Sequence, residues 1–262
     1  MHKRQFLKEY YDNTPRRFPR FLRKKDLLIV TVAFNKPDLI TLQNKLIHKY
    51  MRDSFNYVVC DNSNDDKISA NLKRKCKLRR IRYVRLPSTK IVNPSSHPSL
   101  SHAYSLNWIV KNILPLCYCK YLVVIDHDIF PINYYSFLDK IKDQDFYGVR
   151  DTKKRGWYLW PGFTAINAQK FTNKINFLPI DGMDTGGSMW TSIYSKIDNR
   201  KLKFATKQNR AIGNGSNKQR DVYQVIDKSW LHLVNGSNWA NLKSTQKKDN
   251  LLSTIKDGSV KI

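Results

Sequence analysis

Apolar runs alternate with amphipathic stretches through the first half of the chain. Residues 26–35 (DLLIVTVAFN) are apolar and rich in β-branched side chains, which is typical of a strand buried in a parallel sheet. Pro37 and Asp38 suit the start of a helix, and leucine and isoleucine then recur at helical spacing. The pattern predicts strands at 26–35, 57–60, 81–86 and 121–132, and helices at 37–51, 68–76 and 100–114. This alternating order predicts a doubly wound α/β fold, in which ligands bind at the carboxyl ends of the strands.

The second half follows a different pattern, in which glycine and tryptophan cluster. It predicts strands at 146–150, 156–167 and 177–180, and short helices at 188–195 and 221–227. Because no linker separates the two halves, the second half is expected to pack onto the same sheet. The expected organisation is a basic arm at 1–25, a single domain at 26–240 and a loose polar tail at 241–262.

Positive charge dominates the composition, since 47 Lys and Arg residues against 21 Asp and Glu give a net charge of +26. This excess favours an anionic partner, whether nucleic acid, anionic lipid or a phosphorylated substrate, although a biased codon composition explains the lysines equally well. The apolar runs are far shorter than the roughly 20 residues that span a bilayer. The N-terminus lacks the apolar segment of a secretory signal, so we expect a cytoplasmic protein whose four cysteines stay reduced.

The positions of the glycines limit how a nucleotide could be bound. All ten glycines lie at or after Gly148. The preceding residues therefore cannot contain a Walker A loop or a GxGxxG dinucleotide fingerprint. A nucleotide bound by this half would be held without a glycine cradle for its phosphates.

Two carboxylates, Asp126 and Asp128, follow the apolar residues of the fourth predicted strand. At the point where a strand leaves the sheet they can reach one divalent cation, and Mn²⁺ or Mg²⁺ prefers such oxygen ligands. Aspartate is also common in turns, so a structural role stays open. Farther along, His232 precedes Gly236 and Ser237, whose backbone N–H groups and hydroxyl suit phosphate oxygens. His232 would complete the metal ligands, although a lone histidine is more often structural.

These features together resemble the GT-A fold glycosyltransferases of the broad family-two type and are similar to small viral and bacterial polysaccharide glycosyltransferases. The segments that carry the resemblance are LLIVTVAFN, YVVCDNSNDD, SHAYSLNWIV, YLVVIDHDIF, DGMDTGG and WLHLVNGSNW. The resemblance implies a Rossmann-like sheet with a nucleotide-binding half at 26–130 and an acceptor-binding half at 131–240. It also implies metal-dependent transfer of a sugar from a nucleotide diphosphate sugar, with UDP-sugars favoured, to a glycan, lipid-linked or protein-linked hydroxyl. The missing QxxRW motif argues against a processive synthase.

The resemblance also assigns roles to individual residues. Asp61 would contact the base, although a strand-end turn is its ordinary alternative. His102 and Asn107 are five residues apart and do not share a helix face, so at most one is expected to contact substrate. Asp128 and His232 correspond to the metal ligands, and Asp126 would contribute indirectly. The full nucleotide-sugar set is Val32, Ala33, Phe34, Asn35, Asp61, Ser101, His102, Asn107, Asp126, Asp128, Gly236 and Ser237.

The acceptor side offers two carboxylates and two tryptophans. Asp184 resembles the acid that takes the proton of the acceptor hydroxyl, and it is favoured over Asp181 beside the same glycine-rich turn. Either aspartate could instead cap the helix predicted from residue 188. Trp157 and Trp160 suit a platform for the acceptor sugar, while a place in the core is an equally open interpretation.

Two other classes of function stay open. Cations crowd residues 73–85, and a nucleic-acid-binding protein could lay such a basic segment along phosphates, with a solvated surface as the structural alternative. A phosphotransferase resembling the haloacid dehalogenases also uses a DxD motif, but near the N-terminus rather than after three strands. If the chain is a glycosyltransferase, nucleic acid is not expected as a partner. The surplus cations would then steer an anionic donor or hold the arm at 1–25 against an anionic membrane.

Overall fold

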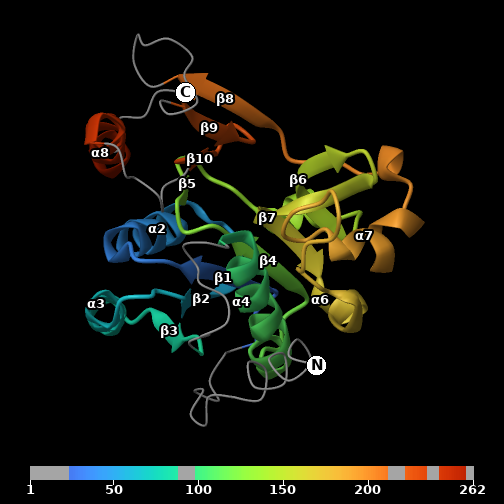
Figure 1. Cartoon of the computed structure of the whole chain (residues 1–262), viewed down its shortest axis with the longest axis horizontal. Helices are drawn as coiled ribbons and strands as arrows, with labels where there is room; N and C mark the ends of the chain where they lie inside the picture. The colour runs from blue at the N-terminus through green and yellow to red at the C-terminus, as the bar shows by residue number, and fades with distance from the viewer. Residues whose placement is uncertain (1–23, 88–97, 212–221, 235–241, 258–262) are drawn as a thin grey trace.

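The computed structural model describes residues 24–87, 98–211, 222–234 and 242–257. The strands of its central sheet are β1 (Leu27–Ala33), β2 (Phe55–Asp61), β3 (Arg82–Arg85), β4 (Tyr121–Ile125), β6 (Phe146–Lys153) and β7 (Gly156–Asn167). They lie in the order β3-β2-β1-β4-β7-β6 (Figure 1). The first four are parallel, and β7 runs antiparallel to both β4 and β6. The predicted mostly parallel α/β sheet is confirmed, and β6 and β7 join the second half of the chain to it.

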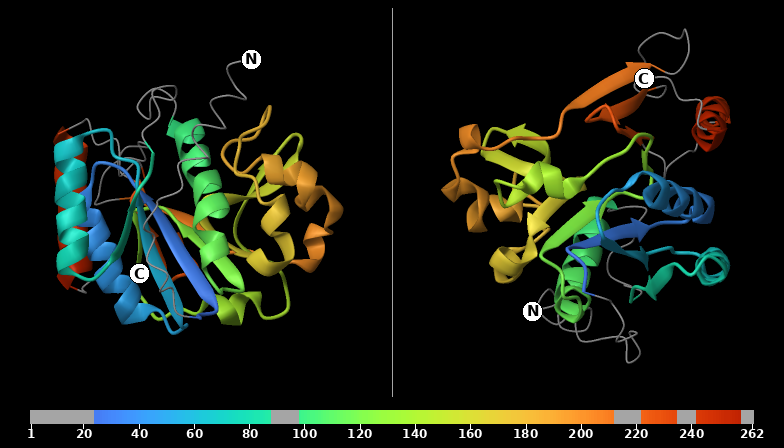
Figure 2. Two further views of the ribbon diagram at one scale, coloured as in Figure 1. Left: turned by 90° about the horizontal axis from the view of Figure 1, so that it is seen from below. Right: turned by 180° about the vertical axis from the view of Figure 1, so that it is seen from behind.

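Helices cover both faces of this sheet (Figure 2). They are α2 (Pro37–Tyr50), α3 (Asp66–Leu78), α4 (Pro98–Asn112), α5 (Phe137–Ile141), α6 (Ala168–Phe171), α7 (Ser188–Ser192) and α8 (Leu242–Asp257), with 3-10 turns η1 (Leu114–Leu116), η2 (Thr172–Lys174), η3 (Tyr194–Lys196) and η4 (Asn199–Lys201). Leu28 and Val30 of β1 belong to the core under α4, whereas Leu27 and Ile29 belong to the core under α2 and α3. Successive side chains of a strand point to opposite faces of the sheet. Because helices cover both faces here, the side chains on both faces of β1 are buried, and its apolar run is what predicted the strand.

A second sheet begins where β4 ends. It consists of β5 (Ile129–Pro131), β10 (Trp230–His232), β9 (Val222–Ile226) and β8 (Lys207–Ala211), in that order and all antiparallel. Trp230 closes the junction of the two sheets, because its fully buried ring lies 5.3 Å from the ring of Phe163 and 5.8 Å from that of Phe137. Residues 126–128 form the link between β4 and β5, so both aspartates of the DxD triplet lie at this junction.

Two predicted elements of the second half are wrong. The helix predicted at 221–227 is strand β9 in its described part, since Val222–Ile226 pairs with β8 on one side and β10 on the other. Val, Tyr and Ile make up four of its five residues and favour strands, and pairing on both sides adds to this preference. The strand predicted at 177–180 forms only an isolated bridge between Ile180 and Met183.

The C-terminal segment also differs from the expected loose tail. Residues 242–257 form helix α8, and its Leu252 and Ile255 are buried. They share an apolar cluster with Leu42 of α2, Phe130 of β5 and Leu231 of β10. Leu251 packs partly buried against the same cluster, so three apolar side chains near the end of α8 dock a helix that is mostly polar.

The four cysteines are placed in the core. Cys60, Cys76, Cys117 and Cys119 are buried free thiols that pack as small apolar residues, as predicted. Burial raises the pKa of Cys76 to about 12 and that of Cys119 to about 11. Within the described ranges, every helix is too short or too polar to cross a bilayer.

Candidate active site

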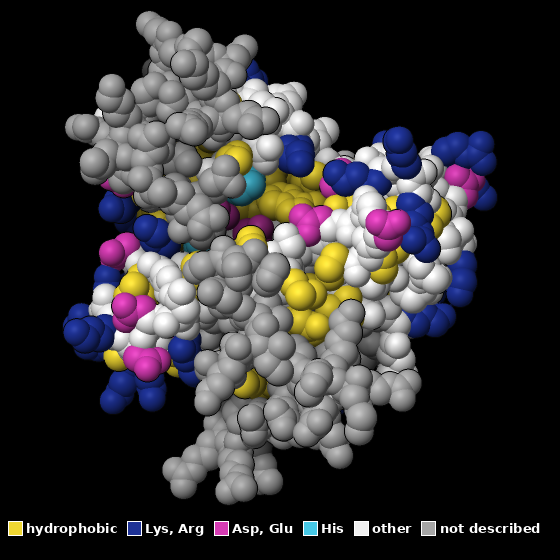
Figure 3. Space-filling model, in the orientation of Figure 1, with side chains coloured by type: hydrophobic (Ala, Val, Ile, Leu, Met, Phe, Trp, Pro, Cys, Tyr) yellow, Lys and Arg dark blue, Asp and Glu magenta, His cyan; other side chains and the backbone are white. Residues whose placement is uncertain are grey.

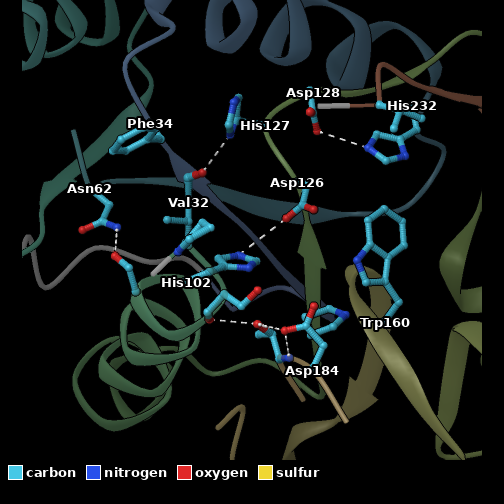
Figure 4. Close-up of a pocket in the computed structure, with 16 residues that line it drawn as sticks. Val32, Phe34, Asn62, His102, Asp126, His127, Asp128, Trp160, Asp184 and His232 are labelled. Carbon is cyan, nitrogen blue, oxygen red and sulfur yellow. Dashed lines mark hydrogen bonds and ion pairs between the residues drawn. The ribbon is translucent and has the colours of Figure 1, made fainter. Parts of the chain in front are cut away.

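A cavity of about 350 Å³ opens at the carboxyl ends of the parallel strands (Figure 4). The loops that follow β1, β2 and β4 at this end are residues 34–36, 62–65 and 126–128, and we call them the carboxyl edge. The first turn of α4, strand β7, the loop before α7 and strand β10 complete the walls. Nine residues singled out in the sequence line it: Val32, Phe34, Ser101, His102, Asp126, Asp128, Trp160, Asp184 and His232.

The turn that carries Asp126 is held by a buried amide. Nε2 of Gln43, on α2, donates to the carbonyl oxygens of both Asp126 and Ile129 at 2.7 Å. Its Oε1 accepts from the Tyr57 hydroxyl at 2.7 Å. The Asp126 N–H donates to the Gly162 carbonyl on β7 at 2.9 Å. These bonds fix the backbone of Asp126 and Ile129, and the side chains of Asp126 and Asp128 line the cavity.

Asp128 and His232 face each other across the cavity floor. Oδ1 of Asp128 lies 3.6 Å from Nε2 of His232, and the Leu233 N–H donates to the Asp128 carbonyl at 2.9 Å. Nδ1 of His232 donates to Oε1 of Gln224 at 2.8 Å. Burial lowers the pKa of His232, and the charges of Asp128 and Asp126 raise it, with burial the larger effect. The lowered pKa favours the neutral form of His232, and because Nδ1 donates to Gln224, the lone pair on Nε2 faces the Asp128 carboxylate.

His102 is the partner of Asp126. Nε2 of His102, on the first turns of α4, lies 3.5 Å from Oδ1 of Asp126. Burial raises the pKa of Asp126, His102 lowers it, and the neighbouring Asp128 raises it further. Two carboxylates two residues apart thus each have a histidine from another element, His102 from α4 and His232 from β10.

Asp184 lines the cavity from a turn that is hydrogen-bonded to α4. The Thr185 N–H donates to Oδ1 of Asp184 at 2.7 Å, and the Thr185 hydroxyl donates to the carbonyl of Ser99 at 2.8 Å. Asp181 lies outside the cavity, in the two-residue turn between Ile180 and Met183. Gly182 completes that turn with a φ of +74°, a conformation that favours glycine. The sequence preference for Asp184 over Asp181 thus agrees with their placement.

The two tryptophans of β7 have different environments. The ring of Trp160 lines the cavity, 5.0 Å from the His232 ring, with the Lys207 ammonium 5.4 Å from its centroid. Trp157 is buried in the core, where its ring lies 4.7 Å from that of Tyr194. Trp157 is therefore a core residue, and of the two only Trp160 lines the cavity.

The charge inside the cavity is opposite to that of the chain. Among the described residues that line it are three aspartates and three histidines but no Lys or Arg. Figure 3 shows acidic and histidine side chains inside the hollow, with Lys and Arg around its outside. An anion that enters such a site must bring or share a cation, because a buried charge needs a partner.

The Asp128–His232 pair fits one side of a divalent-cation site. A cation would stabilise the carboxylate oxygen of Asp128 and the facing imidazole nitrogen of His232. Gln224 fixes the orientation of the His232 ring by a hydrogen bond, as the residues behind metal ligands commonly do. In the described part of the chain no three His, Cys, Asp or Glu side chains form a complete metal centre. The remaining ligands would come from substrate phosphates and water, as is usual for Mg²⁺.

Four other predicted residues do not reach the cavity. Asp61 is fully buried, and its carboxylate accepts from Ser69 at 2.6 Å, Tyr83 at 2.7 Å and the N–H of Ser63 at 2.9 Å. Ala33 is buried, the amide of Asn35 donates to Asn64, and the amide of Asn107 donates to Asn176. Asp61 thus fits the strand-end turn that the sequence left open. Gly236 and Ser237 lie outside the described residues.

Sequence reasoning missed four polar residues of the cavity, Asn62, Ser99, His127 and Thr185. Asn62 follows Asp61 and faces the opposite way, donating to the Ser101 hydroxyl at 2.9 Å. Strand alternation could have found it, because consecutive side chains point to opposite faces. Nδ1 of His127 donates to the Val32 carbonyl at 3.2 Å, and Thr185 anchors the Asp184 turn. No local signal distinguishes these last two residues.

Neither a protein-family model nor a curated protein matches the chain, whereas solved structures do. An active-site mutant of LgtC aligns with 86% of this chain and 95% of its own, at 14% identity and a TM-score of 0.49. The mannosyltransferase PcManGT from Pyrobaculum calidifontis, in complex with GDP-Man and Mn²⁺, aligns with 78% of this chain and 59% of its own, at 14% identity and a TM-score of 0.43. WbbM, a bifunctional glycosyltransferase, aligns with 59% of this chain at 10% identity and a TM-score of 0.39. The chain spans about a third (33%) of the length of WbbM. A further LgtC structure is named as a galactosyltransferase in complex with donor and acceptor sugar analogues.

Proposed function

We propose that the protein is a metal-dependent glycosyltransferase that moves a sugar from a nucleotide diphosphate sugar to the hydroxyl of an acceptor. One observation carries the proposal. Asp126, Asp128, Asp184 and His232, from three separate parts of the chain, face one cavity at the carboxyl ends of parallel strands. UDP-sugars are the donors we expect, with a glycan, a lipid-linked or a protein-linked hydroxyl as acceptor.

The lining of the cavity supports a role for a divalent cation. Asp128 and His232 would hold Mn²⁺ or Mg²⁺, with Asp126 beside them. When bound, the cation would neutralise the charge that builds up on the leaving nucleoside diphosphate. The first turn of α4 lines the same cavity, and the partial positive charge of a helix N-terminus also favours phosphate.

Asp184 is the carboxylate we assign to the acceptor. As the acceptor hydroxyl attacks C1 of the donor sugar, its proton would pass to Asp184. Oδ2 is the oxygen that would receive it, because Oδ1 already accepts the Thr185 N–H. Thr185 in turn is bonded to Ser99 of α4, which fixes the position of Asp184 relative to the donor side of the cavity.

Trp160 would support the acceptor sugar. Its ring lines the cavity, 5.0 Å from the His232 ring at an interplanar angle of 40°. Aromatic faces pack well against the C–H faces of sugars, and contact with His232 limits how far the indole can turn. This would hold the acceptor over the Asp184 side of the site.

Nucleotide release provides the test. We would incubate the full chain with UDP- and GDP-sugars and Mn²⁺ or Mg²⁺, with and without EDTA, and follow release of the nucleoside diphosphate. We expect release that EDTA abolishes and that Asp128→Asn lowers by about 100-fold or more, as loss of a group that stabilises developing charge does. Asp143→Asn, an exposed aspartate of the same chemistry outside the cavity, is the matched control and should behave as wild type. Release that is unchanged in Asp128→Asn would refute the metal assignment, and no release from any donor would refute the function.

A further inference from the structure

The end of the sheet opposite the cavity has its own chemistry. Parallel strands all begin at one edge, so the loops that precede β1, β2, β3 and β4 lie together there. These loops are residues 24–26, 51–54, 79–81 and 113–120, and we call them, with Leu78 at the end of α3, the amino edge. Backbone hydrogen bonds join them, since the Leu27 N–H donates to Ser54 and the Lys120 N–H to Asp26.

The four large hydrophobic side chains that are exposed in the described part of the chain all lie at or against this edge. Leu78 is 69% exposed, Leu116 48% and Tyr118 78%. Tyr134 is 57% exposed and reaches the edge because the guanidinium of Arg52 lies 5.2 Å from its ring. Single exposed hydrophobic residues are ordinary, but their concentration on one edge of the sheet indicates an interaction surface.

Cations outnumber carboxylates in the amino-edge loops. The amino-edge loops contain six Lys and Arg residues against two aspartates. One of these, Asp53, already accepts from the Ser136 hydroxyl and the Phe137 N–H, both at 2.6 Å. Arg79 and Arg80 follow Leu78 directly, so this exposed hydrophobic side chain has two cationic neighbours in the sequence.

A second cavity, of about 360 Å³, opens at the same edge. Lys25, His48, Arg80 and Arg82 help to line it, and no Asp or Glu does so among the described residues. Arg80 has a φ of +55°, a left-handed conformation that glycine adopts far more readily at the end of a helix. The position thus carries a cation where backbone conformation alone would favour glycine. The size and charge of this cavity suit a phosphate headgroup.

We propose that the amino edge docks the protein on an anionic lipid bilayer. Tyrosine and leucine side chains favour the membrane–water interface, and surrounding Lys and Arg residues are attracted to anionic headgroups. A nucleic acid would match the cations but would leave Leu78 and Leu116 without an apolar environment, which is why we favour the bilayer.

Docking by this edge also orients the proposed active site. The cavity opens at the other end of strands such as β1, whose seven residues span roughly 23 Å. The bound protein would therefore keep its cavity open to water, which favours a glycan or a protein-linked acceptor over the lipid-linked one among those proposed. Membrane binding does not depend on the proposed transferase activity, and each can fail without the other.

Vesicle flotation of the full chain tests the proposal. We expect flotation with vesicles of phosphatidylcholine mixed with phosphatidylserine, little with phosphatidylcholine alone, and weaker binding at high salt. Arg79→Glu with Arg80→Glu should weaken binding by roughly tenfold or more. Leu78→Ser with Tyr118→Ser should weaken the part of binding that resists salt. All four side chains are at the surface, and thermal melts would confirm that the variants are folded.

The matched control is Lys154→Glu with Arg155→Glu, which makes the same charge change in the exposed turn before β7. It should float like the wild-type chain. Three results would overturn the proposal: equal binding to both kinds of vesicle, unchanged binding of both amino-edge variants, or binding to a DNA duplex without binding to vesicles. Nucleotide release measured on the same preparations reports separately on the proposed function.

Discussion

The two ends of the central sheet differ in charge and in what they expose. The carboxyl-edge loops hold three aspartates and one lysine, and Asp126 and Asp128 turn into a cavity. The amino-edge loops hold six cations and two aspartates and expose Leu78, Leu116 and Tyr118. The net charge of +26 therefore says little by itself. Its distribution shows that the scarce carboxylates gather where a cation-dependent site is proposed, while cations and exposed apolar groups gather at the opposite end.

The two ends also differ in how firmly their side chains are held. At the carboxyl edge a buried amide, Gln43, fixes the turn of Asp126, and histidines face both aspartates of the triplet. At the amino edge Arg79, Arg80 and Leu78 are exposed. Catalysis requires fixed geometry, whereas a docking surface requires charge and accessible apolar area. Substitutions at the two ends should therefore affect different measurements.

The largest effect is expected at Asp184. We predict that Asp184→Asn lowers the rate of sugar transfer by about 10²- to 10⁴-fold, as loss of a general base does, and leaves donor affinity nearly unchanged. Transfer kinetics and calorimetric titration with the donor would measure the two effects. Asp181→Asn, in the neighbouring turn but outside the cavity, is the control and should transfer normally. The reverse result would assign the base to Asp181.

The next effect is expected at Gln43. Gln43→Leu would leave the carbonyls of Asp126 and Ile129 without their buried donor, so we predict a fall of about 2–5 kcal/mol in the free energy of unfolding. Tyr57→Phe removes only the bond to Oε1 of Gln43 and should cost about 1 kcal/mol. Urea titration of both variants would measure this. Equal costs would mean that the amide does not hold the turn.

Asp61 separates a structural role from a role in nucleotide binding. Because its carboxylate accepts three hydrogen bonds and lies 3.3 Å from Arg85, we predict that Asp61→Asn lowers the free energy of unfolding by about 1–3 kcal/mol. Donor affinity should stay close to that of the wild type, since Asp61 does not line the cavity. Weaker donor binding without loss of stability would instead support the base contact that the resemblance implies.

The smallest effect on catalysis is expected at the amino edge. Arg79→Glu with Arg80→Glu should change the free energy of unfolding by no more than about 0.5 kcal/mol, as is usual for surface positions. Nucleotide release by this variant should equal that of the wild type, even though vesicle binding falls. A large loss of release would show that the two ends of the sheet are coupled, and would break the distinction drawn between them.

Much of the architecture was predictable because its signals are local. β1 is a continuous apolar run, α2 begins at Pro37 as expected, and the DxD triplet follows a buried strand. The helix predicted over β9 ignored a local signal, because four of its five residues are valine, tyrosine or isoleucine, which favour strands, and the strands on either side pair with them. The packing of α8 could not be predicted from Leu252 and Ile255, because the apolar side chains that they contact come from α2, β5 and β10.

The sequence by itself determined the α/β order, the aspartates at the end of β4 and the lack of a glycine cradle in the first half, because each depends on neighbouring residues. Tertiary structure alone decided which strand-end side chains share a cavity. It buried Asp61 under Ser69 and Tyr83 and exposed its neighbour Asn62 to the site. It also placed His232 3.6 Å from Asp128, across 104 positions of sequence. The physical reason is that partners of a buried polar group come from wherever the chain packs, and no local pattern records them.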